Sequence, residues 1–331
     1  MLFIKAPEQR RYTSTCVKMK NISYQWSGDL SNHLTFRCRD NRGKKSMLSR
    51  IKVREAMRKN PLRLEQRQSL DLAISSLIKH KANAALIQDQ QLEEDLGLIS
   101  KTDLLALYYA GLPLQTPLAD VLISPIFTCN QEDTLDNALS LMLDQGIKRV
   151  FVRTDQESSI CGVLSYADIV GLMYRFCCKC DKSLPNSRNG LGLDETLLVR
   201  DVMQQKVMSC RPEDSIVDAL EILSLQPFSA LLVQEGPGEL PGVLSKTDLI
   251  LAYRHSLPLD YEVRRIFHAP ALSCSRQEPL VQALKRMILA DVHRLFVHGA
   301  DPWQIQGVLS LTDAARARSG SCRACKASRL Q

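Results

Sequence analysis

The sequence predicts a mixed α/β (α+β) fold in which one strand–helix–strand–strand–helix unit, βαββα, occurs four times in two tandem pairs. The first observation is a seven-residue pattern, Gly-aliphatic-aliphatic-Ser-x-x-Asp, whose four glycines are separated by 65, 80 and 65 residues. The second is that the two halves of the chain align at a nearly constant offset of 145 residues. Short, long and short intervals indicate two pairs of units with extra residues between the pairs. The copies are GLISKTD (97–103), GVLSYAD (162–168), GVLSKTD (242–248) and GVLSLTD (307–313).

The elements of one unit can be followed along its second copy. The segment SPIFTC (124–129) suits a strand, and QEDTLDNALSLMLDQG (131–146) has apolar residues at helical spacing. The apolar positions of RVFVR (149–153) are β-branched or aromatic, which predicts a strand. A polar turn then leads to a second strand, ICGVLS (160–165), and the spacing in YADIVGLMYRF (166–176) is helical again.

This unit resembles a CBS repeat, and two units in tandem resemble a Bateman module, over roughly residues 48–318. The chain is similar to stand-alone bacterial CBS proteins and to the γ subunit of AMP-activated kinase, which also has four CBS repeats. The resemblance implies two modules stacked as a disc that one chain can complete; head-to-head or head-to-tail stacking, and further oligomerisation, stay open. The expected parts are a basic, disordered arm (1–47); a first module (48–183) with repeats at about 51–110 and 117–176 and a C-x-x-C tail; a linker (184–197); and a second module (198–331) with repeats at about 198–255 and 261–318 and a second C-x-x-C tail.

The Ser-x-x-Asp part of the pattern precedes a helical segment in each unit, which is typical of a capping box. The same helix end, with its free N–H groups and its dipole, also favours a phosphate. The resemblance implies that each motif Asp holds the ribose of an adenine nucleotide (AMP, ADP or ATP) and that the Ser and Thr hydroxyls approach its phosphates. The second unit departs from the pattern because Ala167 replaces the threonine. The residues so assigned are Ser100, Thr102, Asp103, Ser165, Asp168, Ser245, Thr247, Asp248, Ser310, Thr312 and Asp313.

Basic residues begin the first hairpin strand of the two even units only. They are Lys148 and Arg149 in the second unit and His293 and Arg294 in the fourth. Cations there could neutralise phosphates that reach across the pair, and the alternative is that they are ordinary surface charges. We expect unequal sites in each pair, and two nucleotides per chain rather than four.

The even units also end in a C-x-x-C element, so that the same offset of 145 relates the pairs Cys177/Cys180 and Cys322/Cys325. Four thiolates would make a tetrahedral metal site if the even units face each other, with zinc as the first expectation and an iron–sulfur cluster as the second. The alternative is a set of unliganded thiols or a redox dithiol pair. Three further cysteines, at positions 129, 210 and 274, occupy equivalent first-strand positions and are expected to be small buried residues near the nucleotide pocket.

The bulk composition excludes several classes of function. The net charge of +7 comes from residues 1–50, which hold 11 Lys+Arg and 3 Asp+Glu, so the remainder is nearly neutral and nucleic-acid binding is not expected. No apolar run is long enough to cross a membrane and no signal peptide is evident, which predicts a cytoplasmic protein whose cysteines are thiols, metal ligands or simply buried rather than disulfides. No P-loop, G-x-S-x-G or H-E-x-x-H motif occurs, so we expect no enzyme activity.

The leading hypothesis is therefore a regulatory protein that senses adenine nucleotides and acts on an unknown separate protein partner. The alternative is a metal- or redox-responsive assembly protein that uses the CBS core as a scaffold for its four-cysteine site.

Overall fold

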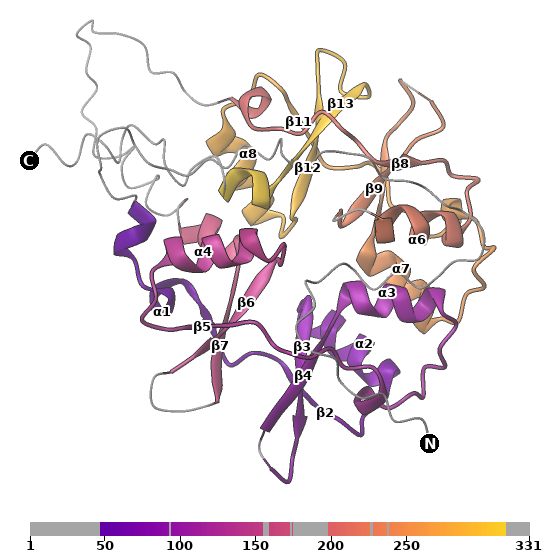
Figure 1. The fold of residues 1–331 in the computed structure, drawn as a ribbon. Helices are drawn as coiled ribbons and strands as arrows, with labels where there is room; N and C mark the ends of the chain where they lie inside the picture. The colour runs from indigo at the N-terminus through magenta and orange to yellow at the C-terminus, as the bar shows by residue number, and fades with distance from the viewer. Residues whose placement is uncertain are drawn as a thin grey trace, which may run out of the picture. The chain divides into compact units, whose positions relative to one another are not determined.

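The computed structural model describes residues 47–92, 94–154, 159–172, 174, 198–225, 228–236 and 238–315 (Figure 1). The predicted arm up to residue 46, the linker and both C-x-x-C tails lie outside these ranges. Where the structure describes the chain, no helix has both the length and the apolar character that a membrane crossing requires.

Four small sheets confirm the predicted α/β fold of repeated units. In the first unit, the first strand pairs parallel to the second, and the second pairs antiparallel to the third. One helix follows the first strand and another follows the third. The elements of this unit are β2 (Arg63–Glu65), α2 (Leu70–Lys79), β3 (Ala84–Asp89), β4 (Glu94–Ser100) and α3 (Lys101–Tyr109).

The other three units repeat this order and this strand pairing. The second unit has β5 (Thr128–Asn130), α4 (Leu135–Asp144), β6 (Arg149–Arg153), β7 (Ile160–Ser165) and a helical segment at 166–172. The third has β8 (Ser209–Cys210), α6 (Ile216–Leu225), β9 (Ala230–Val233), β10 (Gly242–Ser245) and α7 (Lys246–Arg254). The fourth has β11 (Ser273–Ser275), α8 (Leu280–Leu289), β12 (Arg294–His298), β13 (Ile305–Ser310) and a helical segment at 311–315.

Local sequence accounts for these elements. In α4 the residues Leu135, Ala138 and Met142 lie on one face and are buried, as their spacing predicts. The helix begins where the hydroxyl of Thr134 accepts a hydrogen bond from the N–H of Asn137, at 3.2 Å. Strand β6 is buried at its three central residues and carries an arginine at each end. The helix and strand predicted for this unit are thereby confirmed.

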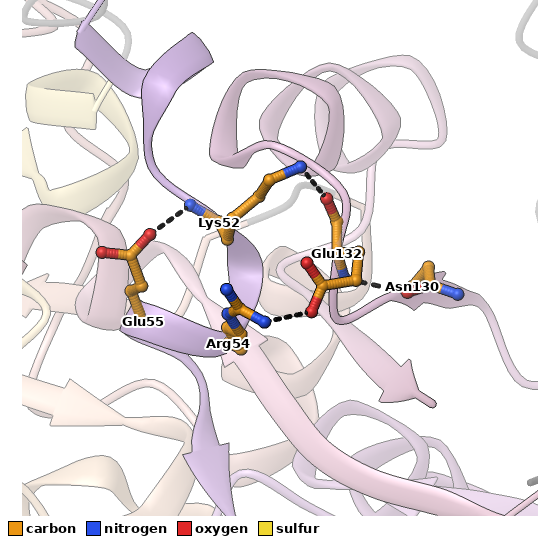
Figure 2. A network of polar contacts seen from close by, with 5 residues as sticks. All are labelled: Lys52, Arg54, Glu55, Asn130 and Glu132. Atoms are coloured by element: carbon orange, nitrogen blue, oxygen red, sulfur yellow. Dashed lines mark hydrogen bonds and ion pairs between the residues drawn. The ribbon is translucent and has the colours of Figure 1, made fainter. Parts of the chain in front are cut away.

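The segment in front of each unit does not pack on that unit; it crosses to the other unit of the same module. In the first module this crossover segment contains η2 (Met47–Arg50), α1 (Val53–Ala56) and β1 (Arg58–Lys59), and β1 pairs antiparallel with β7 of the second unit. Figure 2 shows the polar contacts that hold it there: Arg54 forms an ion pair with Glu132, and the Lys52 ammonium donates to the Glu132 carbonyl.

The other three crossover segments contain η3 (Leu118–Asp120), η4 (Val199–Asp201) and η5 (Val263–Arg265), and each forms a bridge to the strand that carries a motif glycine. The bridges join Ile123 to Leu98, Gln204 to Val308, and His268 to Val243. Because of this approach a side chain does not fit at the glycine. A Cβ at Gly97 or at Gly307 would lie 2.7 Å from the carbonyl oxygen of Ile123 or of Gln204, respectively. The motif glycine is therefore required by backbone packing.

Odd units pack with odd units, and even units with even units. Helices α3 and α7 lie side by side (Figure 1), where Tyr108 and Tyr253 stack with ring centroids 4.8 Å apart. Each tyrosine hydroxyl donates to a carbonyl of the other module, Tyr108 to Leu257 at 2.7 Å and Tyr253 to Leu112 at 2.6 Å. Buried residues of the second and fourth units, among them Val170 and Ala315, form a second shared core. These contacts decide in favour of the head-to-head arrangement that the sequence left open.

Candidate functional site

The motif Ser and Asp form the predicted capping interaction at the start of all four motif helices. In each unit the serine N–H donates to Oδ2 of the aspartate three residues on, at 2.7 Å for Asp103, 2.8 Å for Asp168, 2.7 Å for Asp248 and 3.0 Å for Asp313. One carboxylate oxygen is therefore committed to the helix end. The other oxygen, Oδ1, is the one that remains for a further partner.

The partner of Oδ1 differs between units. The Arg58 guanidinium lies 3.0 Å from Oδ1 of Asp168, the Gln204 amide donates to Oδ1 of Asp313 at 3.0 Å, and the His268 ring lies 3.1 Å from Oδ1 of Asp248. All three side chains come from crossover segments. Within the described part of the chain, Oδ1 of Asp103 has no hydrogen bond or ion pair, and the equivalent crossover residue, Ile123, is apolar.

The two odd units exchange lysines across the contact between the modules. The Lys101 ammonium donates to Oγ1 of Thr247 at 3.0 Å, and the Lys246 ammonium donates to Oγ1 of Thr102 at the same distance. Each lysine lies between the Ser and the Thr of its own motif, so each motif helix receives a cation from the other module. Lys246 is buried, whereas Lys101 is half-buried.

Six basic residues form one connected cluster at this contact, and their mutual repulsion is not fully neutralised. Loss of hydration and repulsion from Lys246, Arg294 and Arg149 lower the pKa of Lys148 to about 7. Lys148 is nevertheless exposed, so this part of the cluster is accessible to solvent. Loss of hydration and repulsion from Arg294 lower the pKa of Lys246 to about 8, although Asp103 partly opposes this. The cluster consists of Lys101, Lys148, Arg149, Lys246, His293 and Arg294.

The two arginines of this cluster begin β6 and β12, where the sequence predicts them. Arg294 crosses to the third unit, donating to the Ala230 carbonyl at 2.8 Å and to the Ser229 hydroxyl at 2.6 Å. Its Nε is buried and has no hydrogen-bond partner among the described residues. Arg149 lies within electrostatic reach of both Asp103 and Asp168, beside Arg58. Both guanidinium groups are charged at neutral pH.

This arrangement can bind an anion that also carries hydroxyl groups. The cations and the N-terminal N–H groups of the motif helices attract phosphate, and an unengaged carboxylate oxygen can accept a hydrogen bond from a ribose hydroxyl. The structure brings Thr102, Asp103, Thr247 and Asp248 together with the cation cluster. It gives Thr312, which is half-buried, no hydrogen bond within the part of the chain that it describes.

Sequence reasoning missed five residues of this site: Lys101, Lys246, Arg58, Gln204 and His268. A signal for the lysines was present, because both odd motifs read Ser-Lys-Thr-Asp whereas the even motifs have Tyr166 and Leu311 at the lysine position. These two residues are buried in the core that the even units share. Arg58, Gln204 and His268 leave no comparable signal in the sequence, since their side chains differ in chemistry.

The cysteines that the sequence singles out fall into two groups. Cys177, Cys180, Cys322 and Cys325 lie outside the described residues, and in the remainder no cluster of three or more His, Cys, Asp or Glu could hold a metal ion. The three first-strand cysteines are on β5, β8 and β11 as predicted; those on β8 and β11 are buried, and Cys129 on β5 is half-buried. Burial raises the pKa of all three thiols to about 12.

The cysteine of β8 lies away from the motif. Cys210 pairs with Val233 at one end of β9, whereas Ser245 pairs at the other end. Cys210 lines a cavity of about 560 Å³ together with Arg211, Asp214 and Gln234. This cavity receives none of the six cations and is not part of the site.

Comparisons with known proteins point to one family. The CBS domain family model matches residues 118–175 and 199–255. A protein from Methanocaldococcus jannaschii, described as a proposed archaeal homologue of γ-AMPK, is similar in structure with a TM-score of 0.68 at 14% identity, covering 81% of this chain and 99% of that one. A conserved protein from Pyrococcus horikoshii has a TM-score of 0.52 at 17% identity, with coverages of 81% and 99%.

A CBS domain protein from Pyrobaculum aerophilum complexed with AMP has a TM-score of 0.34 at 23% identity, covering 36% of this chain and 90% of that one. No curated protein sequence matches the chain. The recurring Gly-aliphatic-aliphatic-Ser-x-x-Asp motif, the four matching sheets and the family-model matches agree: the chain has the fold of CBS-domain proteins, and residues 118–175 and 199–255 match the CBS domain itself.

Proposed function

We propose that this chain binds adenine nucleotides and regulates a separate protein partner, without catalysing a reaction. The observation that carries the proposal is the cluster of six basic residues at the contact between the odd motifs, where burial and repulsion lower the pKa of Lys148 to about 7 and that of Lys246 to about 8 despite the nearby motif aspartates. Such a cluster costs folding free energy in the ligand-free chain, because its charges are desolvated and repel one another. A polyphosphate or phosphate group would offset that cost.

The motif geometry supports a nucleotide as the source of the phosphate. A ribose hydroxyl would donate to Oδ1 of a motif aspartate, while the phosphates would extend along the N-terminus of the same helix toward the cluster. Adenine is proposed as the base because the chain is similar to CBS-domain proteins. The proposed contact residues are those that the sequence assigned, Ser100, Thr102, Asp103, Lys148, Arg149, Ser165, Asp168, Ser245, Thr247, Asp248, His293, Arg294, Ser310, Thr312 and Asp313, together with Lys101 and Lys246.

The lysine exchange supports a regulatory role. A nucleotide at Asp103 would contact Lys246, and one at Asp248 would contact Lys101, so each ligand would touch both modules. A ligand changes the relative setting of two bodies only if it binds one setting better than another. Contacts with both modules provide that difference, and the changed setting is what a protein partner would detect.

Isothermal titration calorimetry of the full chain with AMP, ADP and ATP tests the proposal. Wild-type protein should bind at least one of them, and Arg149→Met should weaken binding by about tenfold, the effect of losing one charge-assisted contact. Arg153→Met is the matched control, because Arg153 is exposed at the other end of the same strand. Folded wild-type protein that binds none of the three nucleotides would overturn the proposal.

A further inference from the structure

Each motif strand is met by one residue of the crossover segment from the other unit of its module, and three of the four motif aspartates contact the side chain of that residue. We call Arg58, Ile123, Gln204 and His268 the crossover residues; the carbonyl of each packs on a motif glycine, and its backbone bridges or pairs with the adjoining strand. The backbone contact fixes where the crossover side chain begins. That side chain therefore always starts next to the strand that leads into the Ser-x-x-Asp turn.

Three crossover side chains already occupy the oxygen that a ribose would use. Arg58, Gln204 and His268 reach Oδ1 of Asp168, Asp313 and Asp248 at 3.0, 3.0 and 3.1 Å. A ribose hydroxyl that donates to the same oxygen has to displace or share this partner. Arg58 and His268 are exposed, with 58% and 73% of their side chains accessible, so they can move at a modest cost in affinity.

The fourth crossover residue leaves its aspartate open. The side chain of Ile123 offers no hydrogen bond, the residue is 46% exposed, and Oδ1 of Asp103 has no hydrogen bond or ion pair among the residues described here. An exposed apolar side chain at the crossover position equivalent to Arg58, Gln204 and His268 also suits a nucleoside, whose ribose needs an acceptor and whose base needs an apolar surface.

From this difference we infer that the crossover residue decides which of the four motifs binds a nucleoside most tightly, and that the motif of Asp103 is the primary site. The inference rests on the proposed function, since it ranks sites for the same ligand. Arg58, Gln204 and His268 are then specificity-determining residues, which weaken the other three sites because they compete with the ribose for Oδ1 of the motif aspartate.

Calorimetric titration with AMP and ATP, on the full chain and on single variants, tests the ranking. Asp103→Asn should reduce the affinity of the tightest site by about tenfold or more, and by more than Asp168→Asn does. Ile123→Arg should weaken the same site by about fivefold, because it supplies the ion-pair partner that Arg58 supplies to Asp168. Ile123→Val is the matched control and should stay within about twofold of wild type.

The converse variant removes a competitor. Arg58→Ile should strengthen the site at Asp168 by about three- to fivefold, which is the worth of an exposed ion pair. Thermal unfolding of every variant identifies any loss of binding that comes from loss of fold, and Ile123→Arg, at an exposed position, should unfold near the wild-type temperature.

The same titrations separate failure of the proposed function from failure of the site ranking. If the wild-type chain binds no adenine nucleotide, the proposed function is overturned, and the ranking with it. If the wild type binds but Asp168→Asn costs more affinity than Asp103→Asn, or if Ile123→Arg binds as tightly as wild type, the ranking is wrong while the proposed function stands.

Discussion

Lys246 donates a hydrogen bond from its ammonium group to Oγ1 of Thr102 across 144 positions of the sequence, at 3.0 Å. Lys101 returns the contact to Thr247 at the same distance. A buried lysine with a pKa lowered to about 8 is an unfavourable choice for packing alone. The Lys101–Lys246 pair is explained if each module supplies a cation to the ligand at the motif helix of the other module.

The first prediction separates binding from stability at Lys246. Lys246→Met should weaken ATP binding by about tenfold, because a charge-assisted contact to phosphate is lost. The ligand-free variant should be at least as stable as wild type, since a desolvated and repelled charge is replaced by an apolar chain of similar length. Calorimetry and thermal unfolding measure the two effects, with the exposed Lys79→Met as control. A variant that is less stable and binds normally would contradict the assignment.

The second prediction concerns the pH dependence of stability. The folded chain holds the pKa of Lys246 at about 8 against an ordinary value of 10.5, so between these values the unfolded chain binds a proton that the folded chain has released. The free energy of unfolding of ligand-free protein should therefore rise with pH across this window, and the contribution is lost as the pH falls through about 8. Urea unfolding at about pH 7.5 and about pH 9.5 measures the rise, which Lys246→Met should reduce. Equal rises in both proteins would contradict it.

The third prediction addresses the tyrosine pair that joins the odd units. Tyr108 and Tyr253 are each 4% exposed, and Tyr108→Phe leaves the Leu257 carbonyl without its donor, at a cost of about 1 kcal/mol. Tyr108→Ala also removes the stacked ring and should cost about 3–5 kcal/mol. Chemical denaturation gives both values. Tyr109→Phe, whose hydroxyl makes a solvent-exposed bond to Glu221, should change stability by less than about 0.5 kcal/mol.

The fourth prediction tests why the motif begins with glycine. A Cβ at Gly307 would lie 2.7 Å from the carbonyl oxygen of Gln204, which belongs to a hydrogen-bonded backbone segment and cannot move alone. Gly307→Ala should therefore destabilise the chain by about 1–3 kcal/mol in thermal or urea unfolding. Gly236→Ala, where no atom lies within 4 Å, is the control and should be close to neutral. If the two variants unfold alike, the crossover segment does not impose the glycine.

The fifth prediction concerns the four-cysteine site, which stays a prediction from the sequence. In the described residues the even units share one core that contains Val170 and Ala315, which precede Cys177 and Cys322 in the sequence. Anaerobically purified protein should contain about one zinc ion per chain by elemental analysis. Cys322→Ser should lower that content, and Cys161→Ser, outside both elements, should leave it unchanged. Protein without zinc or iron would remove the metal site.

Local features were predictable because they depend on neighbours within a few residues. The contact between Ser100 and Asp103 follows from a spacing of three residues, and the buried face of α4 from apolar residues three or four apart. The strand RVFVR follows from its short run of β-branched and aromatic residues. The cations Arg149 and Arg294 could also be placed at strand starts, because their strands were readable.

Contacts between distant segments were not predictable in the same way. Nothing in the local pattern indicates that Arg58 reaches Asp168 rather than Asp103, since the crossover exchanges the leading segments between units. Likewise, the lysine of Ser-Lys-Thr-Asp looks like an exposed helix residue until α3 and α7 are packed together.

The sequence by itself determined the fourfold repeat, the order of strands and helices and the positions of the motif aspartates, because periodicity and capping are short-range properties of a chain. Only the tertiary structure decided which units share a core, which aspartate keeps a free oxygen, and that Lys101 and Lys246 serve the opposite module. These outcomes depend on which surfaces bury the most apolar area together, and that is settled by packing across the whole chain.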